Sequence, residues 1–211
     1  MIENKGKIRL GKRIFDIVFS LFAIAILMPI MIIIAVLIKV NSPEGTVLFR
    51  QKRLGLKGKI FEVLKFRTMV PNAELKLQEM FNRNPKLKEE FEETFKLKND
   101  PRIISTIGSF LRKSSLDELP QFFNSLMGTM SIVGPRPIIQ VELKMYGEFQ
   151  KKFLSIKPGI TGLWQVSGRN DINYEERVLL DMKYIDMNSF FEDIKIILKT
   201  TKVMLIRNGS Y

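Results

Sequence analysis

An apolar stretch near the N-terminus runs from Ile17 to Ile38 and reads IVFSLFAIAILMPIMIIIAVLI. It contains 22 residues and no charge. A straight helix of that length would be about 33 Å long, enough to cross a hydrocarbon core of roughly 30 Å. A secretory signal is excluded, because its apolar region has only about 7 to 15 residues and no small-residue cleavage site follows Ile38. The stretch therefore predicts a helix placed in a membrane.

Two features favour a helix that enters and leaves on one face of the membrane. Pro29 follows Met28 near the middle of the stretch, where a proline removes a backbone hydrogen bond, so we expect a break at this pair. Basic residues flank both ends of the stretch: Lys5, Lys7, Arg9, Lys12 and Arg13 before it, and Lys39, Arg50, Lys52 and Arg53 after it. Because basic flanks stay on the cytoplasmic side, they favour a re-entrant hairpin. On these residues alone a kinked spanning helix stays open.

The composition changes after the turn-rich exit at residues 41–45. We therefore divide the chain into a basic flank with a Pro-broken membrane hairpin, residues 1–45, and a membrane-associated cytosolic domain, residues 46–211. The expected fold class is α/β, mainly helical, in which this re-entrant helix-break-helix is joined to a small domain with short strands and interfacial amphipathic helices.

Within the second domain, local patterns predict individual elements. Short strands are expected over residues 46–50 and 59–66, and two solvated amphipathic helices over residues 72–98, interrupted by Pro85. Residues 146–154 are expected to be helical, and 157–170 mostly loop. The helix expected over residues 189–206 is apolar on one side and basic on the other, which fits either a membrane surface or packing against the core.

The composition also excludes several kinds of chemistry. The 211 residues include no His and no Cys, so there is no Ser-His-Asp triad, Cys nucleophile, disulfide or Cys/His zinc site. Catalysis must rest on carboxylates, amines, hydroxyls, guanidinium groups or a hard cation held by oxygen, such as Mg²⁺. The formal net charge of +12 favours anionic partners, which include phosphorylated small molecules, acidic membranes and nucleic acid.

The adjacent carboxylates of Asp117 and Glu118, in SSLDELPQ, form the candidate catalytic pair. Pro120 is tolerated only near the start of a helix, so the pair should lie at a helix N-terminus, where free N–H groups favour negative charge. One carboxylate can attack covalently while the other holds a divalent cation, a division of labour that phosphoryl transfer needs. The same residues also fit a capping box, in which Glu118 only closes the cap on Ser115.

Positive charge near the motifs is suited to a pyrophosphate. Arg136 stands between two prolines that fix the backbone, although an ordinary rigid turn with a solvent-facing Arg is the alternative. The loop at residues 159–169 could hold phosphate through backbone N–H groups, and Trp164 could stack on a base or pack in the core. The other candidate phosphate-binding cations are Arg102, Arg112, Lys113 and Arg169.

Together, these motifs resemble the bacterial sugar transferases of the monotopic phosphoglycosyl transferase family. The matching segments extend over nearly the whole chain: KRIFDIVFS, FRQKRLG, FEVLKFRTM, DPRIISTIGSFLRKSSLDELPQFFN, MSIVGPRP and KPGITGLWQVSGRN. The resemblance implies transfer of a hexose 1-phosphate, of glucose or galactose type, from a UDP-sugar to undecaprenyl phosphate, with release of UMP. An acetamido- or diacetamido-sugar stays open as the substrate, because members that use such sugars share most of these motifs.

The resemblance also implies roles for single residues. Asp117 would be the nucleophile that forms a covalent phosphosugar ester, Glu118 the magnesium ligand and Arg136 a phosphate-binding residue. Lys65 and Arg67, in KFRTM, would lie close to the active site and bind substrate.

The family breaks its membrane helix at a Ser-Pro pair, whereas this chain has Met28 before Pro29. The implied location is the bacterial inner membrane, where a monotopic protein with its catalytic domain facing the cytoplasm would start a capsule, exopolysaccharide or lipopolysaccharide O-antigen glycan. The expected partners are the UDP-sugar, undecaprenyl phosphate and inner-membrane lipid, with Mg²⁺ as cofactor, and a homodimer is compatible with this expectation.

A membrane-anchored basic scaffold or a nucleic-acid-binding protein is the alternative from another class. The basic residues do not form the stripe with interleaved aromatic residues that binders of single strands need. We therefore expect no nucleic-acid partner.

Overall fold

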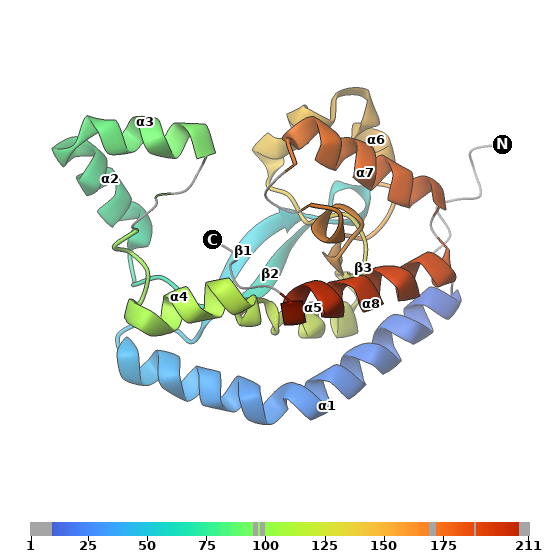
Figure 1. Ribbon diagram of the computed structural model, residues 1–211, viewed down its shortest axis with the longest axis horizontal. Helices are drawn as coiled ribbons and strands as arrows, with labels where there is room; N and C mark the ends of the chain where they lie inside the picture. Colours follow the sequence, from blue (N-terminus) through green and yellow to red (C-terminus); the bar gives the residue numbers. More distant parts are fainter. Residues whose placement is uncertain (1–9, 95–96, 98–99, 169–171, 188, 207–211) are drawn as a thin grey trace.

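The computed structural model describes residues 10–94, 97, 100–168, 172–187 and 189–206. Helices dominate this part of the chain (Figure 1). The α-helices are α1 (Leu10–Asn41), α2 (Ala73–Arg83), α3 (Pro85–Thr94), α4 (Ser105–Ser114), α5 (Gln121–Met127), α6 (Gln150–Phe153), α7 (Tyr174–Met187) and α8 (Phe190–Ile206). The 3-10 helices are η1 (Leu56–Gly58), η2 (Leu116–Glu118), η3 (Gln140–Phe149) and η4 (Trp164–Val166). The strands are β1 (Leu48–Leu54), β2 (Ile60–Phe66), β3 (Ser131–Val133) and β4 (Gly159–Thr161).

The apolar stretch lies inside α1, a single helix of 32 residues that continues through Met28 and Pro29. Figure 1 shows α1 as a bent helix that runs along one side of the domain, below α4, α5 and α8. The expected break is therefore a bend within a continuous helix and not an interruption of it. By length and composition α1 is able to cross a membrane, and an apolar helix of this kind is consistent with membrane anchoring.

Two hydrophobic clusters join α1 to the rest of the domain. One surrounds β3 and includes Ile132, Tyr184 and Ile196, with Phe19 of α1 packed against it. The other packs the C-terminal half of α1 against α4 and β2. Since both halves of α1 contribute to the core, this helix is built into the domain.

Two small sheets position the loops of the domain. β1 and β2 form an antiparallel hairpin in which Leu48 lies opposite Phe66. The strand expected over residues 59–66 is confirmed as β2, whereas the strand expected over residues 46–50 is β1, which begins at Leu48 and extends to Leu54. β3 and β4 pair in parallel. The segment around Gly159 approaches the turn after β3 so closely that a Cβ atom on Gly159 would lie 2.0 Å from the backbone nitrogen of Gly134. Only glycine fits there.

Several local predictions can be compared with these elements. The two helices expected over residues 72–98 are α2 and α3, which begins at Pro85, and Figure 1 shows them standing apart from the rest of the domain. The helix expected over residues 146–154 is wrong in extent. The 3-10 segment η3 begins at Gln140 and is interrupted inside by Gly147, with φ of +47°, and the short helix α6 follows directly at Gln150. The expected loop at residues 157–170 contains β4 and η4.

The C-terminal helix α8 combines the two alternatives that its sequence left open. Asp193 and Ile196 are buried against the core, whereas Phe191 and Leu198 are exposed. Other large exposed apolar side chains are Phe110 of α4, Met127 of α5, Phe190 of α8 and, on α1, Ile14, Val18, Leu21, Phe22, Ile26, Ile30, Ile32 and Ile33. Such a concentration of exposed apolar residues on neighbouring helices is typical of a surface that meets lipid or another apolar phase.

Candidate functional site

The two candidate carboxylates lie on η2, in the short connection between α4 and α5. Ser115 ends α4 with a positive φ of +59°, which turns the chain, and Pro120 caps α5. The side chain of Ser115 makes no capping hydrogen bond. The capping-box alternative is therefore wrong.

Lys65 on β2 lies close to both carboxylates. Its Nζ atom lies 2.6 Å from Oε1 of Glu118 and 4.0 Å from Oδ2 of Asp117. The Asp117 side chain is 14% exposed and that of Glu118 is 38% exposed. The two carboxylates thus share one ammonium group but differ in their access to solvent, as a buried nucleophile and a more open cation ligand would.

Burial, together with the negative charge of Glu118, raises the pKa of Asp117 to about 6, against the opposing effects of Lys65 and Arg112. The desolvation of the charged form is the main cause. At neutral pH most Asp117 side chains still carry the negative charge that a nucleophile needs.

Arg112 and Arg102 are two further basic residues, and they differ in their hydrogen-bond partners. The Nε atom of Arg112 donates a hydrogen bond to Oγ1 of Thr68 at 3.0 Å, and its charge acts on Asp117. Arg102 is held by both carboxylate oxygens of Asp100, at 2.7 and 2.5 Å. Burial and the nearby charge of Arg102 lower the pKa of Arg112. Arg112 therefore faces the candidate pair, whereas Arg102 is matched by its own carboxylate.

Arg67 is committed to the exit of α1. Its guanidinium donates to the carbonyl oxygen of Ser42 at 2.7 Å, to the Ser42 hydroxyl at 2.8 Å and to the carbonyl oxygen of Thr46. A Cβ atom on Gly45 would lie 2.5 Å from Cζ of Arg67, so the exit loop closes tightly around this side chain. These bonds give Arg67 a structural role that its place in KFRTM did not reveal.

Arg136 follows β3 in the Pro-framed turn and is exposed. Its Cζ atom lies 6.0 Å from the centre of the Trp164 ring, and Cζ of Arg177 lies 4.7 Å from the same ring. Trp164 itself is buried, so its packing interpretation is correct, and its ring also carries two cations. Arg169 lies outside the described residues.

Arg53 connects the Arg136 region with the carboxylate pair. It forms an ion pair with Glu142 at 3.1 Å. Burial and the charge of Arg136 lower the pKa of Arg53, while Glu142 and Glu118 raise it. From the sequence, Arg53 is only one of the basic residues that flank the membrane stretch, and no role is predicted for Arg177. The motif FRQKRLG contains Arg53, but nothing local in the sequence indicates that it lies beside Arg136.

The carboxylate pair fits a hard cation that is bound together with a phosphorylated substrate. Among the described residues, no group of three or more Asp, Glu, His or Cys side chains could hold a metal ion. Magnesium is commonly held by one or two carboxylates, with phosphate oxygens and water completing its shell. Glu118 and Asp117 meet that requirement, and a cation at Glu118 would compete with the ammonium group of Lys65.

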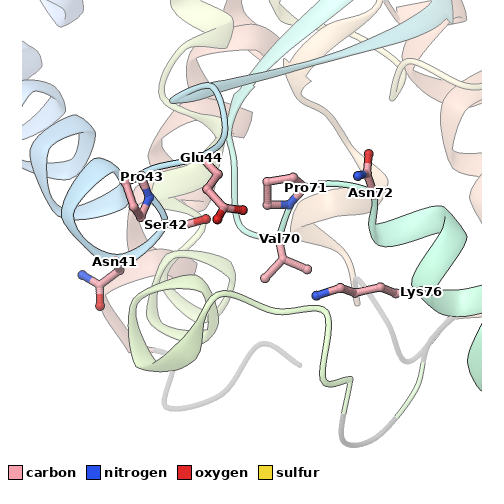
Figure 2. A pocket seen from close by; sticks show the side chains of 8 residues that line it. All are labelled: Asn41, Ser42, Pro43, Glu44, Val70, Pro71, Asn72 and Lys76. Atoms are coloured by element: carbon pink, nitrogen blue, oxygen red, sulfur yellow. The ribbon is translucent and has the colours of Figure 1, made fainter.

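A cavity of about 380 Å³ lies elsewhere, at the exit of α1. It is lined by residues 41–44, residues 70–72 and Lys76. Figure 2 shows Glu44 and Lys76 extending towards Val70 from different elements. Because Asp117, Glu118 and Arg136 do not line it, this cavity is separate from the candidate catalytic pair.

A family model described as bacterial sugar transferase matches residues 7–207. The chain belongs to this family. This sugar transferase is 47% identical over 207 residues to the undecaprenyl-phosphate galactose phosphotransferase of Salmonella typhimurium. The aligned region covers 98% of this chain and 43% of the relative. It is 43% identical to the exopolysaccharide production protein ExoY of Sinorhizobium fredii, over 99% of this chain and 93% of the relative. It is 39% identical to the UDP-glucose:undecaprenyl-phosphate glucose-1-phosphate transferase of Escherichia coli, over 98% of this chain and 42% of the relative.

The sugar transferase therefore spans less than half of two of these relatives and nearly all of the third. The match confirms the resemblance to bacterial sugar transferases that was drawn from the motifs. The relative from Sinorhizobium fredii is named for exopolysaccharide production.

Proposed function

We propose that this sugar transferase moves a hexose 1-phosphate, of glucose or galactose type, from a UDP-sugar to undecaprenyl phosphate and releases UMP. The observation that carries the proposal is the Asp117 carboxylate, which is largely buried and lies close to Lys65 and Arg112. The names of relatives from Salmonella and Escherichia coli, which specify galactose and glucose transfer to undecaprenyl phosphate, support the substrates.

In the first step, a carboxylate oxygen of Asp117 attacks the phosphorus of the phosphate that carries the sugar. A bond forms between that oxygen and phosphorus, and the bond from phosphorus to the bridging oxygen breaks. UMP leaves with the electron pair of that bond. The sugar phosphate is then joined to Asp117 as an acyl phosphate, a mixed anhydride of the carboxylate and the phosphate.

The cations near Asp117 assist this step through charge. Lys65 and Arg112 oppose the build-up of negative charge as the diphosphate approaches the carboxylate. Arg136 and Arg53 offer guanidinium groups that suit phosphate oxygens. Glu118 would hold Mg²⁺, which supplies further charge neutralisation at the diphosphate when it is bound.

In the second step, an oxygen of undecaprenyl phosphate attacks the same phosphorus atom. The bond between phosphorus and the Asp117 oxygen breaks, and the carboxylate is restored with its electron pair. The product is a lipid diphosphate sugar. The lipid substrate requires the site to lie at the headgroup level, which supports a monotopic arrangement in the inner membrane, with α1 as a re-entrant helix and the catalytic domain in the cytoplasm.

The reaction is tested by incubating the purified protein with Mg²⁺, undecaprenyl phosphate and each of several UDP-sugars, including glucose, galactose and acetamido-sugars. We expect UMP and a lipid diphosphate sugar with a UDP-hexose. Preference for an acetamido-sugar would correct the sugar and keep the reaction. Asp117→Asn should release no UMP, and its matched control is Asp186→Asn, because Asp186 is exposed and pairs with Lys152 at the surface. Absence of UMP with every sugar would contradict the proposal.

The topology is tested with single cysteines in this chain, which has none of its own. Position 45 is unsuitable, because a Cβ atom there would collide with Arg67, so we choose Glu44→Cys and Lys5→Cys. In sealed vesicles a re-entrant helix exposes both thiols to a membrane-impermeant reagent on the same side. Labelling from opposite sides would contradict it.

A further inference from the structure

Asp16 is a buried carboxylate on the membrane helix α1, and it contacts residues of β3. It is 2% exposed. Its Oδ1 atom accepts hydrogen bonds from the Ser131 hydroxyl and from the backbone nitrogen of Ile132, each at 3.0 Å. A carboxylate in so apolar a setting is costly unless its oxygens are paired. Both pairing groups belong to β3, so α1 and this strand are joined by direct polar bonds.

A second connection between α1 and β3 runs through α7 and α8. Lys12 of α1 donates to Oδ2 of Asp193 at 2.6 Å. The hydroxyl of Tyr184 lies 2.8 Å from Oδ1 of Asp193 and 3.0 Å from the carbonyl oxygen of Val133. Asp193 and Tyr184 are each 1% exposed. β3 is thus bonded to α1 directly through Asp16. Its last residue, Val133, is also linked to α1 through Tyr184, Asp193 and Lys12.

The turn that follows β3 carries Arg136. The backbone nitrogen of Gly134 donates to Thr161 at 2.9 Å, and that of Gly159 donates to Pro135 at 2.8 Å. The two flanking prolines further limit the backbone at Arg136. These two bonds join the turn to β4, and β4 pairs in parallel with β3. The position of the Arg136 guanidinium therefore depends on β3 through the chain itself and on β4 through these bonds.

We propose that Asp16 is a positioning residue: through its bonds to Ser131 and Ile132 it holds β3, and so places Arg136 for the diphosphate of the nucleotide sugar. This inference rests on the proposed function. It means that the membrane helix also helps to position a substrate-binding residue. The placement of α1 in the membrane and the geometry of the phosphate-binding turn are then set by the same hydrogen bonds.

The chain offers a close control on the same helix. Ser20 lies one turn after Asp16, is fully buried, and its hydroxyl has no hydrogen-bond partner among the described residues. Ser20→Ala removes a buried polar atom from α1 without removing a bond to β3. Asp16→Ala removes both bonds, and Asp16→Asn keeps an oxygen that can accept them.

The variants are compared by kcat/KM for the UDP-hexose. Misplacing a substrate-positioning group by about 1 Å costs on the order of 100-fold, and we expect a loss of that order for Asp16→Ala. Asp16→Asn should restore activity to within about tenfold of the original protein, since its side-chain oxygen can still accept both hydrogen bonds. Ser20→Ala should match the original protein. Equal kcat/KM for Asp16→Ala and Ser20→Ala would overturn the inference.

A double-mutant cycle with Arg136→Ala separates positioning from general damage. If Asp16 acts through Arg136, Asp16→Ala costs much less in the Arg136→Ala background than in the original protein, because the group to be positioned is gone. A purely structural role would give the same fold-loss in both backgrounds and would contradict the inference.

A readout that needs no activity comes from Trp164, the one tryptophan of the chain, which lies beside Arg136. We expect Asp16→Ala to change its emission and its quenching by acrylamide, with no change in Ser20→Ala. If no UDP-sugar yields UMP, the proposed function fails, and Trp164 still decides whether Asp16 controls this turn. Should Asp16→Ala not fold, Ser131→Ala removes one of the two bonds, and an unchanged Trp164 signal there overturns the inference.

Discussion

Lys65 Nζ lies 2.6 Å from the Glu118 carboxylate and 4.0 Å from that of Asp117, although the lysine precedes the pair by more than fifty positions in the chain. The ammonium group of Lys65 therefore lies close to two adjacent carboxylates, of which Glu118 is the more exposed to solvent. The β1–β2 hairpin, which carries Lys65 on β2, brings this charge to η2.

Replacement of Lys65 by Gln should lower kcat/KM for the UDP-sugar by about tenfold or more, because a positive charge beside the attacking carboxylate is lost. The measurement is the rate of UMP release at saturating lipid. Lys59→Gln is the control, since Lys59 is exposed just before the same strand. Equal rates for the two variants would mean that Lys65 has no part in the reaction.

Replacement of Arg67 by Met should destabilise the fold by about 2 to 3 kcal/mol, because buried carbonyl oxygens at the exit of α1 lose a charged donor. Chemical unfolding in detergent micelles measures this. Arg50→Met is the control, because Arg50 is 65% exposed and pairs with Glu62 at 3.4 Å, so it should cost about 0.5 kcal/mol or less. A comparable loss in both variants would contradict the structural role of Arg67.

Replacement of Gly159 by Ala should prevent the parallel pairing of β3 and β4, because the new methyl group would overlap the backbone at Gly134. We expect a protein that is poorly folded or strongly destabilised, as judged by the loss of cooperative thermal unfolding. Gly11→Ala is the matched control. A Cβ atom on Gly11 meets nothing within 4 Å, and alanine favours a helix by about 1 kcal/mol. A well-folded Gly159→Ala variant would show that this close approach is wrong.

Asp181 provides a test by pH. Its carboxylate accepts a hydrogen bond from the hydroxyl of Tyr146 at 2.8 Å. Burial raises its pKa to about 7 from an ordinary value of 3.8, against the opposing effects of Tyr146 and Arg177. Since the folded state then holds a proton that the unfolded state releases, this group favours folding at low pH. That contribution is lost as the pH rises from about 4 through about 7.

Asp181→Asn removes this titration and keeps an oxygen to accept from Tyr146. The melting temperature of the variant should exceed that of the original protein at pH 8, and the difference should narrow by pH 5. Asp186→Asn, an exposed position of the same helix, should show no such change. A difference for Asp181→Asn that is equal at the two pH values would contradict the raised pKa.

The elements that local pattern determines were accessible from the sequence. The apolar run predicts α1, alternation predicts β1 and β2, and Pro120 locates the start of α5 next to Asp117 and Glu118. Each of these depends on neighbours along the chain, which are visible in the sequence itself.

Features that depend on distant residues were not accessible. The residues around Glu118 fit a capping box in the sequence. Nothing local shows that the Glu118 carboxylate instead accepts a hydrogen bond from Lys65. Arg67 was expected at the substrate, because nothing local indicates that the exit loop at Ser42 encloses it. No role for Arg177 is predicted from the sequence, because its contact with Trp164 forms only when α7 packs on η4. Such assignments require the tertiary structure.

The central claim is that Asp117 forms a covalent bond to the sugar phosphate. The most direct measurement is the intact mass of the protein after incubation with Mg²⁺ and a UDP-hexose without the lipid acceptor, together with the UMP released. We expect about one UMP per protein molecule and a mass increase of one hexose phosphate on the peptide that contains Asp117. Neither should occur in Asp117→Asn. Release of UMP only when undecaprenyl phosphate is present, with no mass increase, or full turnover by Asp117→Asn, would contradict it.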